Sequence, residues 1–412
     1  MIFTGFHPNI YKKDVHTALS FLFLPWNWFK LKKGNNTFKV ENWLQNYFTV
    51  KYAITFDSGR TALQKAIEAT NIRYGDEVLV QAYTCLVVSN AINWAGGKPI
   101  YVDINENFNM NVEDLKNKIT EKSKIIIIQH TFGKLADLEK IIQVAKEHNL
   151  IVIEDCAHTI GTKYKGKLAG TWGDIGMFSF GTDKVISSSR GGALITNHEK
   201  LAEKIMELNK KLPESTTKTI LQNLCNFPIF YIGKALYDFL YLGKIALAVA
   251  QKIGLTGKII YKKEKACHKL NFYPAKYPNA LAKILLNQFT KLAEMNNHRQ
   301  EISAIYDKIL QADKIKKPQL LQNEILLRYT ILIDNPQKFI QIAKKKRIIL
   351  GNWYDSVIAP ADKYLNMPGT GYQEGNCPKA EYLAKKSLNL PINKDITYTQ
   401  AKMIAELINN NL

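Results

Sequence analysis

The chain has 412 residues, of which 46% are hydrophobic and 22% are charged, proportions that are ordinary for globular proteins. They exclude a disordered chain, and no stretch of about 18 uncharged apolar residues predicts a membrane-spanning helix. The 56 Lys and Arg residues outnumber the 36 Asp and Glu residues, which gives a net charge of +20. Such an excess favours anionic partners, whether phosphate esters, nucleic acid or an acidic membrane surface.

The cysteines indicate a reducing compartment. Their number is odd and no two have a CxxC or metal-ligand spacing, so we interpret them as free thiols and expect no metal site. The N-terminus lacks the basic stretch, apolar run and small-residue cleavage site of a secretory signal. We therefore expect a cytoplasmic protein. The cysteines are Cys85, Cys156, Cys225, Cys267 and Cys377.

Residues 1–50 are expected to form an N-terminal arm that is irregular over residues 1–45. Residues 19–29 of this arm form an apolar and aromatic patch. The patch is followed directly by Lys30, Lys32 and Lys33.

Residues 51–212 alternate between helical patterns and short apolar runs rich in Val and Ile. This alternation predicts a large α/β domain with a mostly parallel sheet and helices on both faces. Helices are expected at Ala62–Thr70 and Leu138–His148. The expected strands are Glu77–Gln81, Pro99–Asp103, Lys124–Gln129, Leu150–Glu154, Ile175–Phe180 and Gly192–Thr196, and a further short apolar run is Tyr52–Phe56.

Residues 213–265 interrupt this alternation and are expected to form a basic, amphipathic helical insertion, in pieces at 220–230, 231–245 and 246–253. Residues 266–412 are expected to hold a helical connection, Asn279–Leu310, and a smaller C-terminal α+β domain. In that domain we expect a strand at Leu326–Ile333 and helices at Pro336–Lys346 and Thr397–Asn409.

Residues 57–61, with the sequence Asp-Ser-Gly-Arg-Thr, lie between the short apolar run Tyr52–Phe56 and an expected helix. A turn of small polar residues that opens a helix leaves backbone N–H groups free beside the positive end of the helix dipole, which suits a phosphate group. Such a segment, considered alone, is more often an ordinary helix N-cap than a phosphate site.

Two charged residues follow expected strands of the same domain. Asp155 stands at a carboxyl strand end, where parallel sheets bind ligands, and a carboxylate there can hold a protonated heterocyclic nitrogen. Lys184 follows the strand that contains Ser179, and desolvation there would make its amine a nucleophile for a carbonyl. Each residue alone is also compatible with an ordinary role, Asp155 as a helix cap and Lys184 as a surface lysine.

Residues 187–192 have the sequence Ser-Ser-Ser-Arg-Gly-Gly. The glycine pair permits a close backbone approach and Arg190 could bind an anionic substrate group, although a flexible turn explains the segment equally well. Taken together, a phosphate cup, a strand-end Asp and a nucleophilic Lys are the groups that pyridoxal phosphate (PLP) requires.

In this order the motifs resemble the DegT/StrS family of PLP-dependent sugar aminotransferases, within the fold-type-I aminotransferase superfamily. The resemblance covers about residues 52–197 and 278–409, and it implies a large domain built on a mostly parallel sheet of the seven-stranded type. The matching segments include Ser58–Leu63, Gly75–Val78, Pro99–Asp103, His130–Gly133, Ile153–His158, Gly173–Asp174, Phe178–Phe180, Gly351–Asp355, Cys377–Glu381 and Asn389–Pro391.

The resemblance implies roles for individual residues. Lys184 matches the family's lysine that binds the cofactor covalently, and its presence disfavours the family's dehydratase branch, which has His there. Asp155 matches the carboxylate that holds the pyridine nitrogen, and His158 matches the residue that contacts the ring hydroxyl. The family's phosphate contacts are matched by Ser179 and by the backbone of Gly59, Arg60 and Thr61.

Three positions depart from the family's pattern. The position that often holds an aromatic residue over the cofactor ring is Cys85 here, with Tyr83 nearby. The segment whose Asn reaches the partner subunit's phosphate runs from Asn271 to Lys276 here, and either of these two residues could take that role. Arg190 stands where many members carry an acidic residue, which implies a different substrate charge.

The resemblance implies a homodimeric enzyme that transfers an amino group from an amino acid, usually glutamate, to a keto-sugar. The product would serve amino-sugar or cell-surface polysaccharide biosynthesis, and the keto-sugar could be nucleotide-linked or lipid-linked. The alternative is a catalytically idle, membrane-associated scaffold or regulatory binding protein on the same fold. We expect no nucleic-acid binding, because no recognition motif accompanies the positive charge.

The helical insertion suggests a membrane surface. Residues 201–270 contain 12 Lys and 5 acidic residues, an excess of 12 − 5 = +7, and amphipathic basic helices suit the plane of an anionic bilayer. Trp26, Trp28 and Phe29 could add interfacial anchors. We expect peripheral docking on the inner face of a membrane or, equally, an insertion that packs on its own chain or on a second copy.

Overall fold

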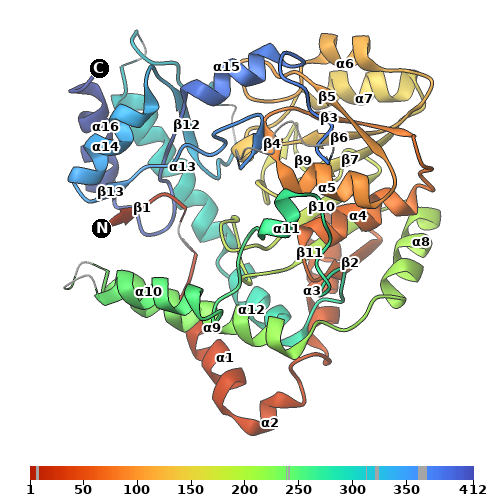
Figure 1. Cartoon of the computed structure of the whole chain (residues 1–412), viewed down its shortest axis with the longest axis horizontal. Coiled ribbons are helices and arrows are strands. Elements are labelled where there is room, and N and C mark those ends of the chain that lie inside the picture. Colours follow the sequence, from red (N-terminus) through yellow and green to blue (C-terminus); the bar gives the residue numbers. More distant parts are fainter. Residues whose placement is uncertain (6–8, 238, 240–241, 312, 321–323, 361–368) are drawn as a thin grey trace.

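The computed structural model describes residues 1–412 apart from residues 6–8, 238, 240–241, 312, 321–323 and 361–368. At its centre is a seven-stranded sheet in the order β2–β11–β10–β7–β6–β3–β5 (Figure 1). In this sheet β11 runs antiparallel to both neighbours and the other pairs are parallel, which confirms the expected sheet. The strands are β2 (Tyr52–Phe56), β3 (Glu77–Gln81), β5 (Lys98–Val102), β6 (Ser123–Gln129), β7 (Ile151–Asp155), β10 (Ile175–Ser179) and β11 (Gly192–Thr196).

Helices bury both faces of the sheet, as a parallel sheet requires. In β6, Ile125 and Ile127 face one helical layer while Ile126 and Ile128 face the other, because successive side chains of a strand point to opposite sides. The first layer contains α4 (Gly59–Ala69), α5 (Leu86–Trp94) and α8 (Glu199–Lys210). The second contains α3 (Asn36–Phe48), α6 (Val112–Lys118), α7 (Leu138–Glu147) and α12 (Asn279–Phe289).

A second core lies in the C-terminal part of the chain and confirms the expected smaller α+β domain. Its strands β12 (Tyr329–Leu332) and β15 (Ser387–Leu390) pair antiparallel. The first strand of the chain, β1 (Ile2–Phe3), pairs with β13 (Ile348–Ile349) of this domain. The helices of this region are α13 (Leu292–Ile309), α14 (Pro336–Lys345), α15 (Pro378–Lys386) and α16 (Tyr398–Asn409).

The expectation that residues 1–45 are irregular is wrong. They contain α1 (Lys12–Phe23), α2 (Pro25–Trp28) and the start of α3. In α1 the residues Val15, Ala18 and Phe21 are buried, and their spacing places them on one face of a helix. This face packs on α9 and α12, so the helix is stabilised by a distant part of the chain.

The helical insertion is present, but its expected internal boundaries are wrong. Helix α9 (Thr217–Ala235) continues through the expected break after Phe230, and it is followed by α10 (Leu242–Lys252) and α11 (Lys262–Lys265). Part of the expected piece 231–245 lies outside the described residues. The expected connection Asn279–Leu310 is likewise two helices, α12 and α13, because residues 290–291 interrupt it. Within the described residues, no helix combines the length and apolarity needed to cross a bilayer.

Candidate active site

A pocket lies at the carboxyl ends of β7 and β10, where parallel sheets place their ligand sites. It encloses about 1140 Å³ of space, part of it open to solvent. Of the residues singled out in the sequence as cofactor or substrate contacts, those that do not line this pocket are Thr61, Tyr83, Asn271 and Lys276. Those that do are Gly59, Arg60, Cys85, Asp155, His158, Ser179, Lys184 and Arg190.

The first turn of α4 forms one end of the pocket. Ser58 is the N-cap, and its Oγ accepts a hydrogen bond from the Thr61 N–H at 3.3 Å, so the Thr61 N–H has a partner within the cap. A Cβ on Gly59 would lie 2.7 Å from the Ser179 Cβ. The absence of a side chain at Gly59 therefore lets the helix N-terminus and the Ser179 hydroxyl face the same space, which is a cradle for an anion.

Asp155 and His158 stand beside each other after β7. The Asp155 Oδ1 accepts a hydrogen bond from the Ala157 N–H at 2.9 Å, and burial raises the pKa of this carboxyl although the charge of Lys184 opposes the shift. The His158 Nδ1 accepts a hydrogen bond from the Phe132 N–H at 3.2 Å. Burial lowers the pKa of His158 well below its usual value, so this ring is neutral and carries its proton on Nε2.

Lys184 is held by contacts to its backbone as well as by its charge. Its carbonyl accepts a hydrogen bond from the Asn9 Nδ2 at 2.5 Å, and the Asn9 Oδ1 in turn lies 3.3 Å from the buried Arg299 Nη2. The Lys184 Nζ lies 3.9 Å from the Asp183 Oδ1. Burial tends to raise the pKa of Asp183, but the charges of Lys184 and Arg328 outweigh it and hold the pKa below its usual value.

The aromatic surroundings come from both domains. Cys85 ends the short strand β4 (Thr84–Cys85), which pairs with β14 (Ile358–Ala359) from the C-terminal region. Tyr83 is fully buried against Phe108, Phe132 and Tyr354 behind the pocket. Tyr354 and its neighbour Trp353 line the pocket, and the sequence analysis did not assign either a role.

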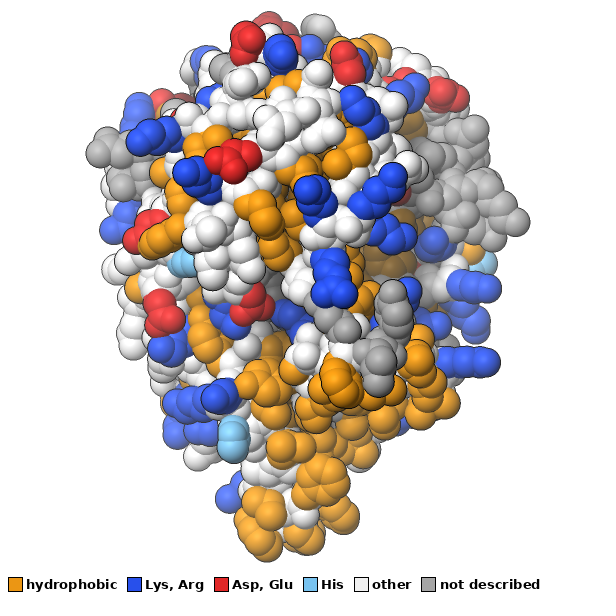
Figure 2. Space-filling model, turned by 90° about the vertical axis from the view of Figure 1, so that its left-hand side faces the viewer, with side chains coloured by type: hydrophobic (Ala, Val, Ile, Leu, Met, Phe, Trp, Pro, Cys, Tyr) orange, Lys and Arg blue, Asp and Glu red, His pale blue; other side chains and the backbone are white. Residues whose placement is uncertain are grey.

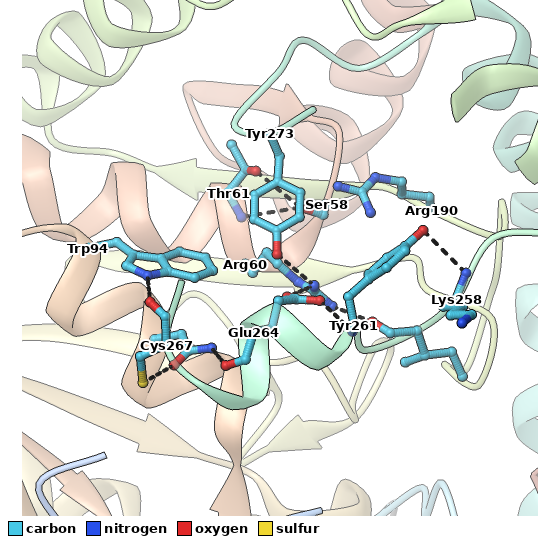
Figure 3. Close-up of polar contacts among 12 residues, drawn as sticks. Ser58, Arg60, Thr61, Trp94, Arg190, Lys258, Tyr261, Glu264, Cys267 and Tyr273 are labelled. Atoms are coloured by element: carbon cyan, nitrogen blue, oxygen red, sulfur yellow. Dashed lines mark hydrogen bonds and ion pairs between the residues drawn. The ribbon is translucent and has the colours of Figure 1, made fainter. Parts of the chain in front are cut away.

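The segment 257–265, which we call the strap, lies against the first turn of α4 (Figure 3), and its residues 257–261 line the pocket. The guanidinium of Arg60 forms an ion pair with the Glu264 carboxylate and donates a hydrogen bond to the Ile259 carbonyl at 2.7 Å. Burial alone would lower the pKa of Arg60, but the charge of Glu264 outweighs it and raises this pKa. The Asn90 Nδ2 holds the Glu264 carbonyl at 2.8 Å, so the strap is fixed at both groups of Glu264.

Arg190 also has a carboxylate partner. Its Nη2 and Nε lie 2.5 Å and 3.1 Å from the Asp57 Oδ2, and its guanidinium lies 5.3 Å from the ring centres of Phe272 and Tyr273. The charge that the sequence analysis offered to a substrate is therefore balanced within the chain. Lys258 of the strap lines the pocket, is exposed, and has no carboxylate partner among the described residues.

Helix α9 contributes a further wall that sequence reasoning missed. Thr219, Asn223 and Asn226 line the pocket from this helix. The Asn226 Nδ2 donates a hydrogen bond to the Ser189 Oγ at 2.6 Å, while its buried Oδ1 has no partner within the part of the chain that is described. No sequence motif marks these residues, because they belong to the insertion and are brought to the pocket only by the packing of α9.

Comparison with known proteins identifies the family of the chain. The sequence profile of the DegT/DnrJ/EryC1/StrS aminotransferase family matches residues 22–224 and 248–409. An uncharacterized protein of Methanocaldococcus jannaschii is 28% identical over 402 residues, which are 95% of this chain and 93% of that protein. The GDP-perosamine synthase of Escherichia coli O157:H7 is 44% identical over 175 residues, or 42% of this chain and 48% of that enzyme.

Among solved structures, the aminotransferase PseC of Helicobacter pylori, which is involved in pseudoaminic acid biosynthesis, superimposes with a TM-score of 0.76. The superposition covers the whole of both chains at 20% sequence identity, so it establishes a shared fold. The family profile matches well over half of the chain and passes over residues 225–247, which hold the end of α9 and the start of α10. The chain belongs to the DegT/DnrJ/EryC1/StrS aminotransferase family.

Proposed function

We propose that this protein is a PLP-dependent aminotransferase that moves an amino group from an amino acid, with glutamate as the expected donor, to a keto-sugar. One observation carries the proposal: a lysine amine, a buried carboxylate and an anion cradle from three separate segments line one pocket. Family membership makes PLP the cofactor. An idle scaffold on the same fold is not favoured, because it has no use for this set of residues.

The residues present fit the cofactor. The first turn of α4 and the Ser179 hydroxyl would hold the phosphate, and Asp155 would hold the pyridine nitrogen as a charged pair. Thr182, two residues before Lys184, lines the pocket with a buried hydroxyl that has no partner among the described residues. A buried hydroxyl is costly without a hydrogen bond, so this atom also indicates that a polar ligand belongs here.

PLP, when bound, withdraws electrons from the substrate carbon that carries the amino group and so makes a proton on that carbon acidic. The Lys184 Nζ accepts this proton and returns one during transfer to the second substrate. Asp155 stabilises a positive charge on the ring nitrogen. The burial of this carboxylate strengthens the electrostatic attraction between the two charges. The neutral His158 offers its Nε2 proton as a hydrogen-bond donor, while the strap and α9 restrict the entry of water.

The acceptor is proposed to be a keto-sugar on a phosphate-containing carrier. Lys258 of the strap and Asn226 of α9 line the pocket, where they offer a positive charge and a carbonyl oxygen that have no partners among the described residues. These groups suit a carrier phosphate and a sugar hydroxyl. A nucleoside diphosphate and a polyprenyl diphosphate present the same phosphate chemistry to these residues.

We also propose a homodimer in the cytoplasm, which rests on the resemblance to fold-type-I aminotransferases, whose sites form at a dimer interface. Light scattering on the purified protein measures the mass in solution and tests this assembly. A peripheral position on the inner face of a membrane is proposed as well, and the surface that supports it is described below.

The test of the function is the absorption spectrum of the purified protein with and without PLP, repeated for Lys184→Ala. We expect the wild type to show the visible absorption of lysine-bound PLP and to lose it on addition of glutamate. Lys184→Ala should lose this absorption and about 10⁴-fold or more of the rate. Lys165→Ala, an exposed lysine of the large domain, is the control, and an equal loss there would contradict the assignment.

A further inference from the structure

An apolar surface at one end of the molecule has no part in the chemistry of the pocket. It is formed by the end of α1, by α2, by the end of α9 and by α10 (Figure 1), and Figure 2 shows it as a broad hydrophobic area. We call this surface the apolar end. Its exposed side chains are Phe23, Trp26, Trp28, Phe29, Ile232, Leu236, Leu242, Ile245, Val249 and Ile253.

Helix α10 is apolar on two sides. Gly243, Leu247 and Ala250 form a buried stripe, which packs on α9 so closely that a Cβ on Gly233 would lie 2.6 Å from Leu247. The opposite side of α10 carries a second apolar stripe. Its residues recur at helical spacing and are all exposed: Leu242, Ile245, Val249 and, directly after the helix, Ile253. An exposed apolar stripe opposite a buried one is suited to a second apolar partner, and the described residues supply none for it.

The tip formed by α2 exposes its apolar side chains even more fully than α10 does. None of the four residues of α2 is buried, and Phe29, which follows it, is 90% exposed while Trp26 is 65% exposed. The tip projects from the body of the molecule beyond α1 (Figure 1). Tryptophan and phenylalanine at a projecting tip are suited to the boundary between lipid headgroups and acyl chains.

Lysines flank both parts of the apolar end. Lys30, Lys32 and Lys33 follow the tip and are exposed. On α10, Lys244 and Lys252 are exposed on one flank of the outer stripe, a position given by 100° of rotation per residue. Residues 1–50 contain 6 Lys and 2 acidic residues, an excess of 6 − 2 = +4, so the charge around the apolar residues is positive and complements an anionic surface.

We infer that the apolar end is an anchor that docks the protein on an anionic lipid bilayer, with the α2 tip inserted and α10 lying in the interface plane. A second copy of the chain is a less suitable partner. Two-fold pairing requires a patch that is complementary to itself, whereas this surface combines a projecting tip with flanking lysines that would repel the lysines of a copy placed against it.

The anchor is connected to the pocket through one helix. The first half of α9 lines the pocket with Thr219, Asn223 and Asn226, and its second half carries Ile232 and Leu236 of the apolar end. Docking would therefore hold the α9 wall of the pocket near the bilayer. The docking inference does not depend on the proposed amino transfer, because lipid binding and catalysis are measured separately.

The experiment mixes the full-length, PLP-loaded protein with vesicles made either of phosphatidylcholine alone or of phosphatidylcholine and phosphatidylglycerol in equal parts. We expect sedimentation with the anionic vesicles, little with the neutral ones, and release by salt. The tip variant Trp26→Ser/Trp28→Ser/Phe29→Ser should lower the partition coefficient about tenfold or more. The α10 variant Ile245→Ser/Val249→Ser should lower it as well.

Two further variants make the result decisive. Tyr74→Ser/Tyr382→Ser removes exposed aromatic residues outside the apolar end and should bind as the wild type does. Lys30→Gln/Lys32→Gln changes exposed charges alone and should reduce binding to anionic vesicles, whatever the apolar variants do to folding. Absence of the wild type from both pellets overturns the inference, as does equal binding of wild type and tip variant. The inference is also overturned if the wild-type protein is a dimer that does not bind vesicles and the tip variant is a monomer, because the apolar end would then be a dimer interface.

Discussion

The two sides of the pocket are built in different ways. The side that holds Asp155, Ser179 and Lys184 is formed by the ends of strands buried in the central sheet and by the first turn of α4. The other side is formed by α9 and by the strap, which is fastened to α4 by the buried ion pair between Arg60 and Glu264 and by the hydrogen bond from Arg60 to the Ile259 carbonyl. The first side is set by the fold of the family, whereas part of the second lies in the stretch that the family profile passes over.

The difference indicates that the two sides have separate functions, one in cofactor chemistry and one in recognition of the acceptor. Cofactor chemistry requires groups held within a fraction of an ångström, which a packed sheet provides. Recognition of a particular acceptor requires groups that can change without disturbing that sheet, and a helix with a strap provides them. Changes on the first side should therefore lower the rate of both half-reactions, and changes on the second side should affect the acceptor alone.

Among changes that leave Lys184 in place, Asp155→Asn on the sheet side should have the largest effect. An amide cannot stabilise a positive ring nitrogen, so kcat for both half-reactions should fall by about 10²-fold or more while PLP still binds. Stopped-flow absorption with glutamate measures the donor half-reaction. Asp137→Asn, at the partly exposed N-cap of α7, is the control, and an unchanged kcat in Asp155→Asn would contradict the role of the carboxylate.

The next effect is expected for Glu264→Gln, which removes one partner of the buried ion pair. Because Arg60 would remain buried without a counter-charge, the free energy of unfolding should fall by about 3 kcal/mol. Denaturant unfolding measures it. The exposed pair of Glu207 and Lys211 supplies the control Glu207→Gln, for which a loss below about 1 kcal/mol is expected. Equal losses in the two variants would show that the strap is not fastened in this way.

A smaller effect is expected for Lys258→Ala, on the strap side. Loss of one charge–phosphate contact should raise KM for the keto-sugar acceptor about tenfold and leave the glutamate half-reaction unchanged. Lys262→Ala, on the same strap but outside the pocket lining, is the matched control. A defect in the glutamate half-reaction would remove the proposed division between the two sides.

The smallest effect is a dependence of stability on pH that arises from His158. Its pKa is held well below 6.5 in the folded protein, so the unfolded chain binds a proton that the folded chain does not. The free energy of unfolding should therefore fall as the pH drops below about 6.5, by up to about 1.4 kcal/mol per pH unit. In His158→Gln this contribution should disappear, while His148→Gln, at an exposed position, should keep the wild-type slope.

Much of the cofactor side could be predicted from the sequence, because its signals are local. The boundaries of β3 and β11 agree with the expected strands, because short runs rich in Val and Ile are stable inside a parallel sheet that is covered on both faces. Ser58 as a cap and Asp155 at a strand end are also local features, so the expected residues meet in one pocket. The helical character of residues 1–45 was missed because α1 depends on burial against α9.

The sequence by itself determined the alternation of strands and helices and the residues that carry the chemistry. Apolar runs and the polar residues at strand ends are patterns among neighbouring residues, so they can be recognised without the fold. Tertiary structure alone decided which charges are free. It paired Arg190 with Asp57 and Arg60 with Glu264, left Lys258 in the pocket wall, and turned the outer stripe of α10 toward solvent. Ion pairing and burial depend on distances between segments that are far apart in the chain, and no local pattern specifies those distances.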